Sequence, residues 1–284
     1  MRRALYSIAL LMTVVMTFAG YCFLEARANP VVRQAIVALP DWPRGAKPVR
    51  VVLISDIHMK SRTMEPGRLA RIVGQINALH PDLVLIAGDF IHRSRPGSAA
   101  ALGAGMVGPL SQLRAPLGVV AVLGNHDRHT GEDAVRAQLT AAHVRVLDDT
   151  AMSVGPLALG GIGDDLAREV DVARTLRAVR AVPGARVLLT HSPDVAPMLP
   201  ADMPLLLAGH THCGQIVLPF YGPLASVTHY GGRYRSGVRR ETTRTVVVTC
   251  GLGTSGAPFR FGAPPDLWLL TLTPAVRPSG QARA

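Results

Sequence analysis

Lysine, cysteine and the aromatic residues are all scarce in this sequence of 284 residues. Its three cysteines are Cys22, Cys213 and Cys250, which is too few for a disulfide-rich framework or a cysteine-rich zinc module, and no disulfide is predicted. Lys47 and Lys60 are the only lysines, and aromatic residues make up 5% of the chain. Because no run of basic residues carries interleaved aromatics, the formal net charge of +11 does not indicate nucleic-acid binding.

Apolar residues, by contrast, make up 48% of the chain, and charged residues make up only 17%. This balance excludes an intrinsically disordered protein and allows a sizeable hydrophobic core. The length is typical of one domain of ordinary size or of two small ones. The sequence therefore indicates a globular body.

Residues 1–28 form a separate amino-terminal segment. Residues 4–24 carry no charge, and a helix of that length crosses a hydrocarbon core of about 30 Å. One interpretation is an uncleaved single-pass anchor, and the alternative is a signal peptide cleaved after Ala26-Arg27-Ala28, followed by export. Arg2 and Arg3 favour a cytoplasmic amino terminus and an extracytoplasmic body, although basic residues beyond the apolar stretch weaken that asymmetry.

Beyond this segment, the sequence predicts a linker over residues 29–48, a folded domain over residues 49–273 and a disordered tail over residues 274–284. Apolar runs predict strands over residues 49–55, 83–87, 119–123, 186–190, 205–208, 245–249 and 267–272. Helical spacing predicts helices over residues 66–79, 99–113 and 131–142. The early alternation and the closely spaced later strands predict an α/β fold in which two sheets pack face to face inside helical layers.

Polar residues follow five of the predicted strands, at the points where those strands end. They comprise two carboxylates, one carboxamide and four imidazoles: Asp56, His58, Asp89, Asn125, His191, His210 and His212. Residues at the carboxyl ends of neighbouring strands converge on one crevice in α/β sheets. This mixed nitrogen and oxygen set suits Mn, Fe, Zn or Co, and it exceeds the needs of one tetrahedral ion. Two divalent ions that share a carboxylate are typical of phosphoryl-transfer sites, so the pattern predicts phosphoester hydrolysis.

The same motifs carry a resemblance to a known family. The order of the strings SDIH at residues 55–58, GD at 88–89, GNHD at 124–127, THSP at 190–193 and GHTH at 209–212 resembles the calcineurin-like metallophosphoesterases. The strings GHTHCGQI at residues 209–216 and GLGTS at 251–255 are similar to the membrane-anchored bacterial subgroup of YkuE-like and YaeI-like phosphodiesterases. The resemblance covers residues 49–272 and implies a four-layer α-β-β-α sandwich.

The resemblance also implies a role for each motif residue. One ion would be held by Asp56, His58 and His212 and share Asp89 with a second ion, which would also bind Asn125, His191 and His210. His126 would act as the general acid or stabilise the transition state, and Asp127 would orient its ring. A metal-bridged hydroxide would attack phosphorus, and His126 would protonate the departing alkoxide.

The expected substrate is a phosphodiester that is lipid-linked or a nucleotide-sugar lipid. Relatives in the resembled subgroup make UDP-2,3-diacylglucosamine, an intermediate of lipid A biosynthesis, one candidate. The alternatives are soluble nucleotides or cell-wall polymers as substrates and, in a different functional class, a non-catalytic membrane-tethered binding module. The complete set of ligand-type residues argues against that last alternative.

Several residues outside the metal motifs have two interpretations each. Arg233 and Arg235 belong either to an anion-binding rim that contacts the substrate or to a solvated hairpin, and His92 is either a substrate contact or a solvated loop residue. Residues 217–224 are an apolar stretch that either rests on a membrane or acyl chain or is buried. Cys213 replaces a glycine usual in the resembled subgroup, and a thiolate ligand is a minor alternative for it.

Overall fold

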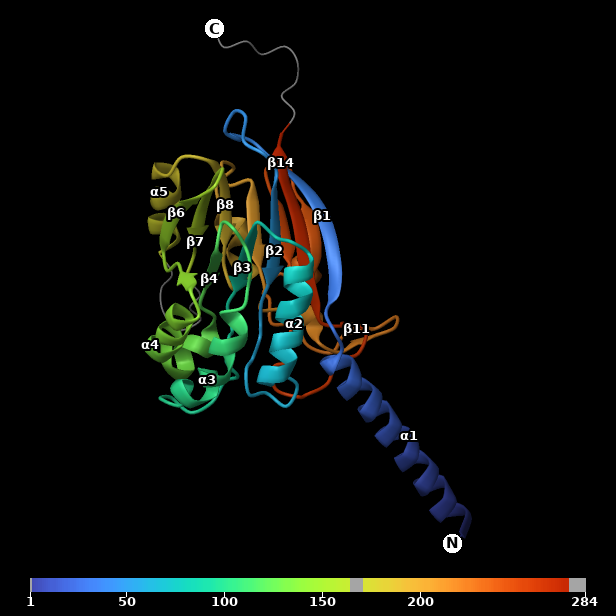
Figure 1. The fold of residues 1–284 in the computed structure, drawn as a ribbon. Helices are drawn as coiled ribbons and strands as arrows, with labels where there is room; N and C mark the ends of the chain where they lie inside the picture. The colour runs from blue at the N-terminus through green and yellow to red at the C-terminus, as the bar shows by residue number, and fades with distance from the viewer. Residues whose placement is uncertain (1, 164–170, 276–284) are drawn as a thin grey trace.

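The computed structural model describes residues 2–163 and 171–275. Helix α1 (Arg2–Arg27) projects from one end of a body built on two six-stranded sheets (Figure 1). Within the described residues, α1 is the one helix long and apolar enough to cross a membrane by its length and composition. An apolar helix at this position is typical of a membrane anchor or a signal sequence.

The first sheet has the strand order β1-β14-β2-β3-β4-β5. Its strands are β1 (Val31–Leu39), β14 (Asp266–Pro274), β2 (Val49–Ile54), β3 (Leu83–Ala87), β4 (Val119–Val122) and β5 (Val144–Val146). Strands β2 to β5 are parallel, as expected for strands joined by helical crossovers, whereas β14 pairs antiparallel to β2.

The second sheet has the order β12-β13-β9-β8-β7-β6. Its strands are β12 (Gly237–Arg240), β13 (Thr245–Val248), β9 (Leu205–Ala208), β8 (Ala185–Leu189), β7 (Leu157–Gly161) and β6 (Thr150–Val154). A short hairpin of β10 (Val217–Leu218) and β11 (Gly222–Pro223) stands apart from both sheets. The described residues also form the 3-10 turns η1 (Pro193–Met198), η2 (His212–Gly214) and η3 (Gly231–Tyr234).

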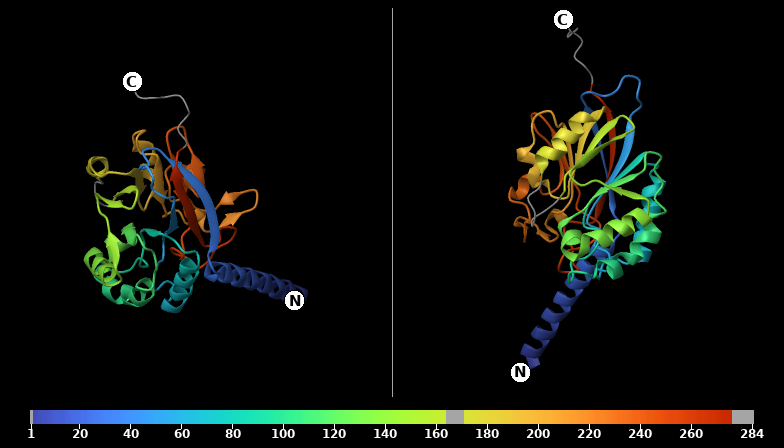
Figure 2. Two further views of the ribbon diagram at one scale, coloured as in Figure 1. Left: turned by 45° about the horizontal axis from the view of Figure 1, so that its top comes forward. Right: turned by 90° about the vertical axis from the view of Figure 1, so that its left-hand side faces the viewer.

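Helices cover the outer face of each sheet (Figure 2). Helices α2 (Pro66–Ala78), α3 (Ala99–Leu110) and α4 (Asn125–Ala141) pack on the first sheet, and α5 (Val172–Ala181) packs on the second. Between the sheets lies an apolar core to which both contribute, including Leu53, Leu85, Leu189 and Leu207. The predicted four-layer α-β-β-α architecture is therefore confirmed.

The predicted linker over residues 29–48 is wrong for its first half. Strand β1 pairs in parallel with β14 over its whole length, from the pair Val31–Asp266 to the pair Leu39–Pro274. As an edge strand between Pro30 and Pro40, β1 is only partly buried, so it lacks the continuous apolar run that marked the inner strands. Pro274 and Ala275 of the predicted tail are attached to this edge, and residues 276–284 lie outside the described residues.

The structure also contains a disulfide that the cysteine pattern did not suggest. Cys213 and Cys250 are bonded to each other although 37 residues separate them in the chain. Cys213 follows β9 and Cys250 follows β13, and these two strands are hydrogen-bonded neighbours in the second sheet. The strand order that unites the two sulfurs could not be deduced from cysteine spacing. Because its sulfur is oxidised, Cys213 offers no thiolate to a metal.

Helix α4 differs from its predicted extent for a local reason. It begins at Asn125 rather than near Gly131, so the Asn-His-Asp motif occupies its first turn. Gly131 has a φ of 149° and interrupts the helix where the sequence suggested its start. Glycine tolerates this backbone conformation because it has no Cβ atom.

Candidate metal centre

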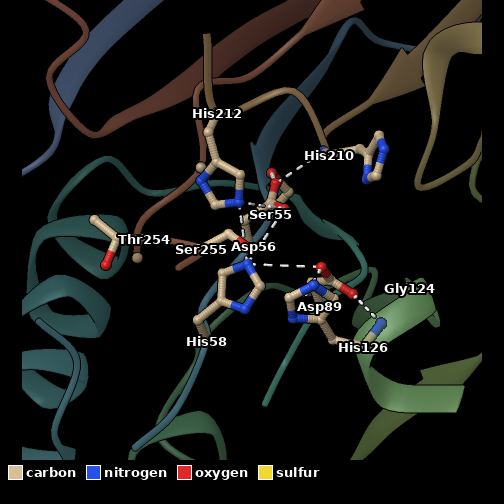
Figure 3. Close-up of polar contacts among 12 residues, drawn as sticks. Ser55, Asp56, His58, Asp89, Gly124, His126, His210, His212, Thr254 and Ser255 are labelled. Atoms are coloured by element: carbon tan, nitrogen blue, oxygen red, sulfur yellow. Dashed lines mark hydrogen bonds and ion pairs between the residues drawn. The ribbon is translucent and has the colours of Figure 1, made fainter. Parts of the chain in front are cut away.

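The ends of five strands bring all seven predicted ligand side chains into one cluster. Figure 3 shows Asp56, His58, Asp89, His210 and His212 of this cluster. Asp56 and His58 follow β2, and Asp89 follows β3. Asn125 begins the helix that follows β4, while the histidines come from the second sheet, His191 after β8 and the His210–His212 loop after β9. Each strand is held rigidly by its neighbours, so the side chains beyond its end have well-defined positions.

One half of the cluster is built around Asp56. Its Oδ1 atom lies 3.4 Å from His212 Nε2 and 3.7 Å from His58 Nε2, and the two imidazole nitrogens are 3.1 Å apart. Asp56 and His58 are completely buried and His212 is almost so. The other oxygen, Oδ2, accepts hydrogen bonds from the Ser55 hydroxyl and from the main-chain N–H of His210. Oδ1 is left facing the imidazoles.

The other half of the cluster is built around His191. Its Nε2 atom lies 3.4 Å from Asp89 Oδ2, 3.2 Å from Asn125 Oδ1 and 3.1 Å from His210 Nδ1. Asp89 Oδ2 is also 3.6 Å from His58 Nε2, so this single oxygen stands between the two halves. That position matches the one expected of a bridging carboxylate.

The backbone around the cluster adopts conformations that most residues avoid. Five of the predicted ligands have left-handed φ values between 47° and 68°: Asp56, His58, Asp89, His210 and His212. Such conformations cost on the order of 1–3 kcal/mol each and concentrate at functional sites. Gly124 approaches the Asp89 carboxylate so closely that a Cβ atom there would overlap it. These strained conformations lower the stability of the loops, and they bring the ligand side chains together.

Hydrogen bonds fix the tautomer of His191. Its Nδ1 donates to the carbonyl oxygen of Ala87 at 2.7 Å, so the lone pair on the neutral ring lies on Nε2, toward Asp89 and Asn125. Asp56 Oδ1 is buried and has no hydrogen-bond partner among the described residues. A buried carboxylate oxygen facing imidazole nitrogens at these distances fits a divalent cation, since a cation would satisfy all of these lone pairs.

Electrostatics in the cluster stabilise anionic carboxylates. Burial alone would raise the pKa of Asp56, but the neighbouring imidazoles, His212 foremost, outweigh it and hold that pKa well below its usual range. The pKa of Asp89 is lowered in the same way, against burial, chiefly by His191. Burial lowers the pKa of His212, and the charges of His58 and Arg260 lower it further. Both carboxylates are therefore ionised and His212 is neutral, as metal ligands must be.

The side chain of Arg260 lies next to the ring of His212, and no motif in the sequence indicates this contact. Its guanidinium is completely buried, lies 3.3 Å from His212 Nδ1 and donates to the carbonyl oxygens of Cys250, Gly251 and Gly253. Burial lowers its pKa to about 10, which leaves it cationic at neutral pH. Arg260 thus connects the ring of His212 with the loop after β13.

His126 lies beside Asp89, as expected, with its Nδ1 atom 3.9 Å from Asp89 Oδ2 (Figure 3). The main-chain N–H of Arg93 donates to Nδ1 at 3.1 Å, so a neutral His126 carries its proton on Nε2. Burial lowers its pKa to about 4, and the charges of His58 and His191 contribute. In this arrangement His126 is a neutral imidazole at physiological pH.

The expected role of Asp127 is corrected by its contacts. Its Oδ1 accepts from the main-chain N–H groups of Phe90 and Ile91, and its Oδ2 accepts from that of Gly124. The carboxylate therefore ties the loop after β3 to the start of α4, and it is Arg93 that holds the ring of His126. Burial and the nearby Asp89 raise the pKa of Asp127 to about 7.

The predicted substrate contacts lie in different surroundings. His92 is partly buried, with its ring centroid 6.4 Å from that of His126. The guanidinium of Arg233 is bonded to Glu241 at 2.6 Å, which commits it to an ion pair within its own loop. The main-chain carbonyl of Arg235 accepts from the hydroxyl of Thr211, between the ligands His210 and His212. Substrate binding by these three residues stays a prediction.

Comparison with known proteins agrees with the fold and the cluster. Residues 49–214 match the family model of the calcineurin-like phosphoesterases, which is more than half of the chain. The chain belongs to this family of metal-dependent phosphoesterases, and its relatives in the family typically bind two metal ions.

Similar proteins occur in bacteria and in animals. The uncharacterized metallophosphoesterase YkuE of Bacillus subtilis is 31% identical over 81% of this chain and 81% of its own length. A transmembrane protein with metallophosphoesterase domain from Danio rerio is 30% identical over 94% of this chain, which spans 62% of that protein's length. An uncharacterized metallophosphoesterase of Helicobacter pylori is 27% identical over 89% of this chain and 66% of its own length.

Proposed function

We propose that this protein is a dinuclear phosphodiesterase that acts on a lipid-linked phosphoester at a membrane surface. The observation that carries the two-ion assignment is the position of Asp89 Oδ2, within 3.6 Å of imidazole nitrogens from both halves of the cluster. One ion would be held by Asp56, His58, His212 and Asp89. The other would be held by Asp89, Asn125, His191 and His210.

Hydrolysis of a phosphodiester requires a nucleophilic water, charge stabilisation on phosphorus and a proton for the leaving alkoxide. Two divalent ions, when bound, would supply the first two of these. His126 would supply the third from its imidazolium form, which the negative charge of a bound phosphodiester favours over the neutral ring. The products are a phosphomonoester and an alcohol, and the imidazole regains its proton from water.

We further propose that α1 stays attached as a membrane anchor. Cys22 and Ala26 near its end are buried in the body. The guanidinium of Arg68, itself buried, donates to the carbonyl oxygens of Arg27 and Ala28, within the potential signal-cleavage site. Cleavage after Ala28 would remove these acceptors and leave a buried cation with fewer partners, which is costly.

The disulfide supports an extracytoplasmic body. Disulfides such as that between Cys213 and Cys250 persist in oxidising compartments and are rare in the cytosol. Arg2 and Arg3 before the apolar stretch favour a cytoplasmic amino terminus. Both observations support a catalytic domain on the outer side of the membrane.

The activity is tested with purified full-length protein, loaded with Mn²⁺ or Zn²⁺ and reconstituted into vesicles. We expect a lipid-linked phosphodiester or pyrophosphate embedded in the vesicles, UDP-2,3-diacylglucosamine among them, to be hydrolysed more efficiently than a soluble nucleotide. A preference for soluble nucleotides or wall polymers would instead support the alternative substrate class. Absence of turnover on every phosphoester in the panel would favour the binding module.

The anchor is tested by fractionation and by mass spectrometry of the mature protein. We expect the full-length protein to pellet with membranes and resist alkaline extraction, while a protein that begins at Asn29 is soluble or released by salt. A mature amino terminus at Asn29 would contradict the anchor and establish cleavage and export.

A further inference from the structure

The hairpin of β10 and β11 presents apolar side chains to solvent at its tip. Phe220 is fully exposed, Tyr221 is 76% exposed, and Leu224 just beyond the hairpin is 56% exposed. Adjacent exposed aromatic residues on a protruding hairpin mark an interaction surface more often than a random surface position. The sequence left open whether residues 217–224 are buried, and the structure shows that their tip is not.

This hairpin is linked through Phe261 to the carboxyl-terminal part of α1, residues 18–27, which we call the root of α1. The ring of Phe261 packs against Phe18 at 5.1 Å and Tyr21 at 6.1 Å between ring centroids. The main-chain carbonyl of Phe261 accepts a hydrogen bond of 2.7 Å from the N–H of Val217, the first residue of β10. Figure 1 shows the hairpin, in orange and labelled β11, projecting near the end of α1 where the helix meets the body.

The hairpin also contacts the loop that carries the predicted metal ligand His212. Gly214, two residues after His212, lies against Pro223 of β11, and a Cβ atom at Gly214 would come within 2.5 Å of the Pro223 ring. Arg260, next to Phe261, contacts the His212 ring, and its main-chain N–H donates to the carbonyl of Cys22 in α1. The root of α1, the hairpin and one metal-ligand loop therefore meet through residues 260 and 261.

The sheet topology places the whole cluster at the same end of the body. Strand β1 starts four residues after α1 and runs parallel to β14, which is antiparallel to β2. The carboxyl end of β2, and with it the ends of the parallel strands β3 and β4, therefore lies at the end from which α1 departs (Figure 1). If α1 crosses a bilayer, the metal cluster faces that bilayer.

We propose that the tip of this hairpin, residues 219–221, inserts into the interfacial region of the bilayer beside α1. The occupant of this surface is the lipid bilayer, because the hairpin is linked through Phe261 to α1, the proposed membrane anchor. Tyr at the headgroup level and Phe at the acyl boundary are the usual interfacial residues of membrane proteins. With two attachment points the body cannot rotate freely about α1, and the metal cluster is held toward lipid headgroups. The site would then act on phosphoesters of lipids in that same bilayer, which rests on the proposed function.

The insertion is tested by fluorescence, independently of any activity. Full-length protein with Phe220→Cys in a Cys22→Ala background is labelled with an environment-sensitive dye and reconstituted into vesicles that contain spin-labelled lipid. We expect emission to shift to shorter wavelength and to be quenched. A dye at Asp41→Cys, in the loop between β1 and β2, is the control and is expected to show neither effect. Emission from position 220 that matches that of position 41 would overturn the proposal, whatever the enzyme hydrolyses.

The functional consequence is tested with Phe220→Ser combined with Tyr221→Ser. Both residues are exposed and lie outside the catalytic machinery, so we expect unchanged folding and unchanged turnover of a soluble nitrophenyl diester. We expect kcat/KM on a vesicle-embedded phosphodiester to fall about tenfold, because the site is no longer oriented toward its substrate. Ile36→Ser, on the exposed face of β1, is the matched control and should change neither rate. An equal loss of kcat/KM on soluble and embedded esters in this double variant would overturn the orienting role. If the unaltered protein hydrolysed none of the esters while the dye at position 220 was still quenched, only the proposed function would be refuted.

Discussion

The inter-sheet core and the metal cluster occupy the same strands but are built on opposite principles. Along β3, the buried residues Leu83–Ala87 are all apolar, and the chain then turns through Gly88 into the buried carboxylate of Asp89. The core gains free energy from apolar burial without the need of any partner. The cluster buries ionised carboxylates on strained loops, a cost that the neighbouring imidazoles offset and that bound cations would offset further. Stability therefore resides between the sheets, and function resides at their ends.

The sharpest test of this division exchanges the carboxylate that joins the two halves of the cluster. Asp89→Asn removes the proposed shared ligand, so we expect both ions to bind weakly and kcat/KM to fall by roughly 10³-fold or more. Metal content per chain and phosphodiester hydrolysis are the measurements. Asp82→Asn, at the other end of the same strand, is the control and should leave both unchanged. Loss of only one ion from the Asp89 variant would contradict the shared position of Asp89.

A smaller effect is expected where chemistry is altered without loss of metal. His126→Ala should keep both ions and lower turnover by roughly 10²–10⁴-fold, the usual contribution of a positioned acid. Esters with leaving groups of low pKa, such as nitrophenolate, should suffer less because they depart without a proton. His129→Ala, exposed on the same helix, provides the comparison. If good and poor leaving groups lost the same factor, His126 would not be the proton donor.

The core is probed by truncating a side chain on β3 that faces the opposite sheet. Leu85→Ala leaves a cavity in a completely buried site and should lower the free energy of unfolding by about 2–5 kcal/mol. The folded fraction should still bind two ions per chain, since the strand ends are unchanged. Chemical denaturation and metal analysis measure the two properties separately, with Ile36→Ala, exposed on β1, as the neutral control. Loss of metal from folded Leu85→Ala protein would show that core and cluster are not separable.

The disulfide lies at the boundary between the two regions. Cys250→Ser should lower the free energy of unfolding by about 2–4 kcal/mol, because the bond closes a loop that the unfolded chain otherwise leaves open. The adjacent loop of His212 is also held by Arg260, so we expect metal binding to persist. Cys22→Ser, which leaves the disulfide intact, is the control. Full loss of metal from the folded Cys250→Ser protein would show that the disulfide is required for metal binding and not only for stability.

Much of the fold was predictable because the inner strands are buried on both faces. Their continuous apolar runs, as in Leu83–Ala87 and Leu205–Ala208, gave the correct strands to within a residue or two. Edge elements carry no such run, so β1 was mistaken for a linker. The contacts of Asp127 were not predictable either. Its position directly after His126 suggested that it contacts that ring, but its Oδ1 accepts hydrogen bonds from the main-chain N–H groups of Phe90 and Ile91.

The sequence by itself determined the class of chemistry, because each of the seven predicted ligands follows a strand end in a short motif that can be recognised without the structure. Only the tertiary structure decided which other residues surround the metal cluster and which surface lies beside it. The contacts of Arg260 with His212 and Cys22, the bond between Cys213 and Cys250, and the exposure of Phe220 join segments far apart in the chain. Such contacts depend on which strands become neighbours, and strand order is set by the packing of the whole sheet rather than by any local pattern.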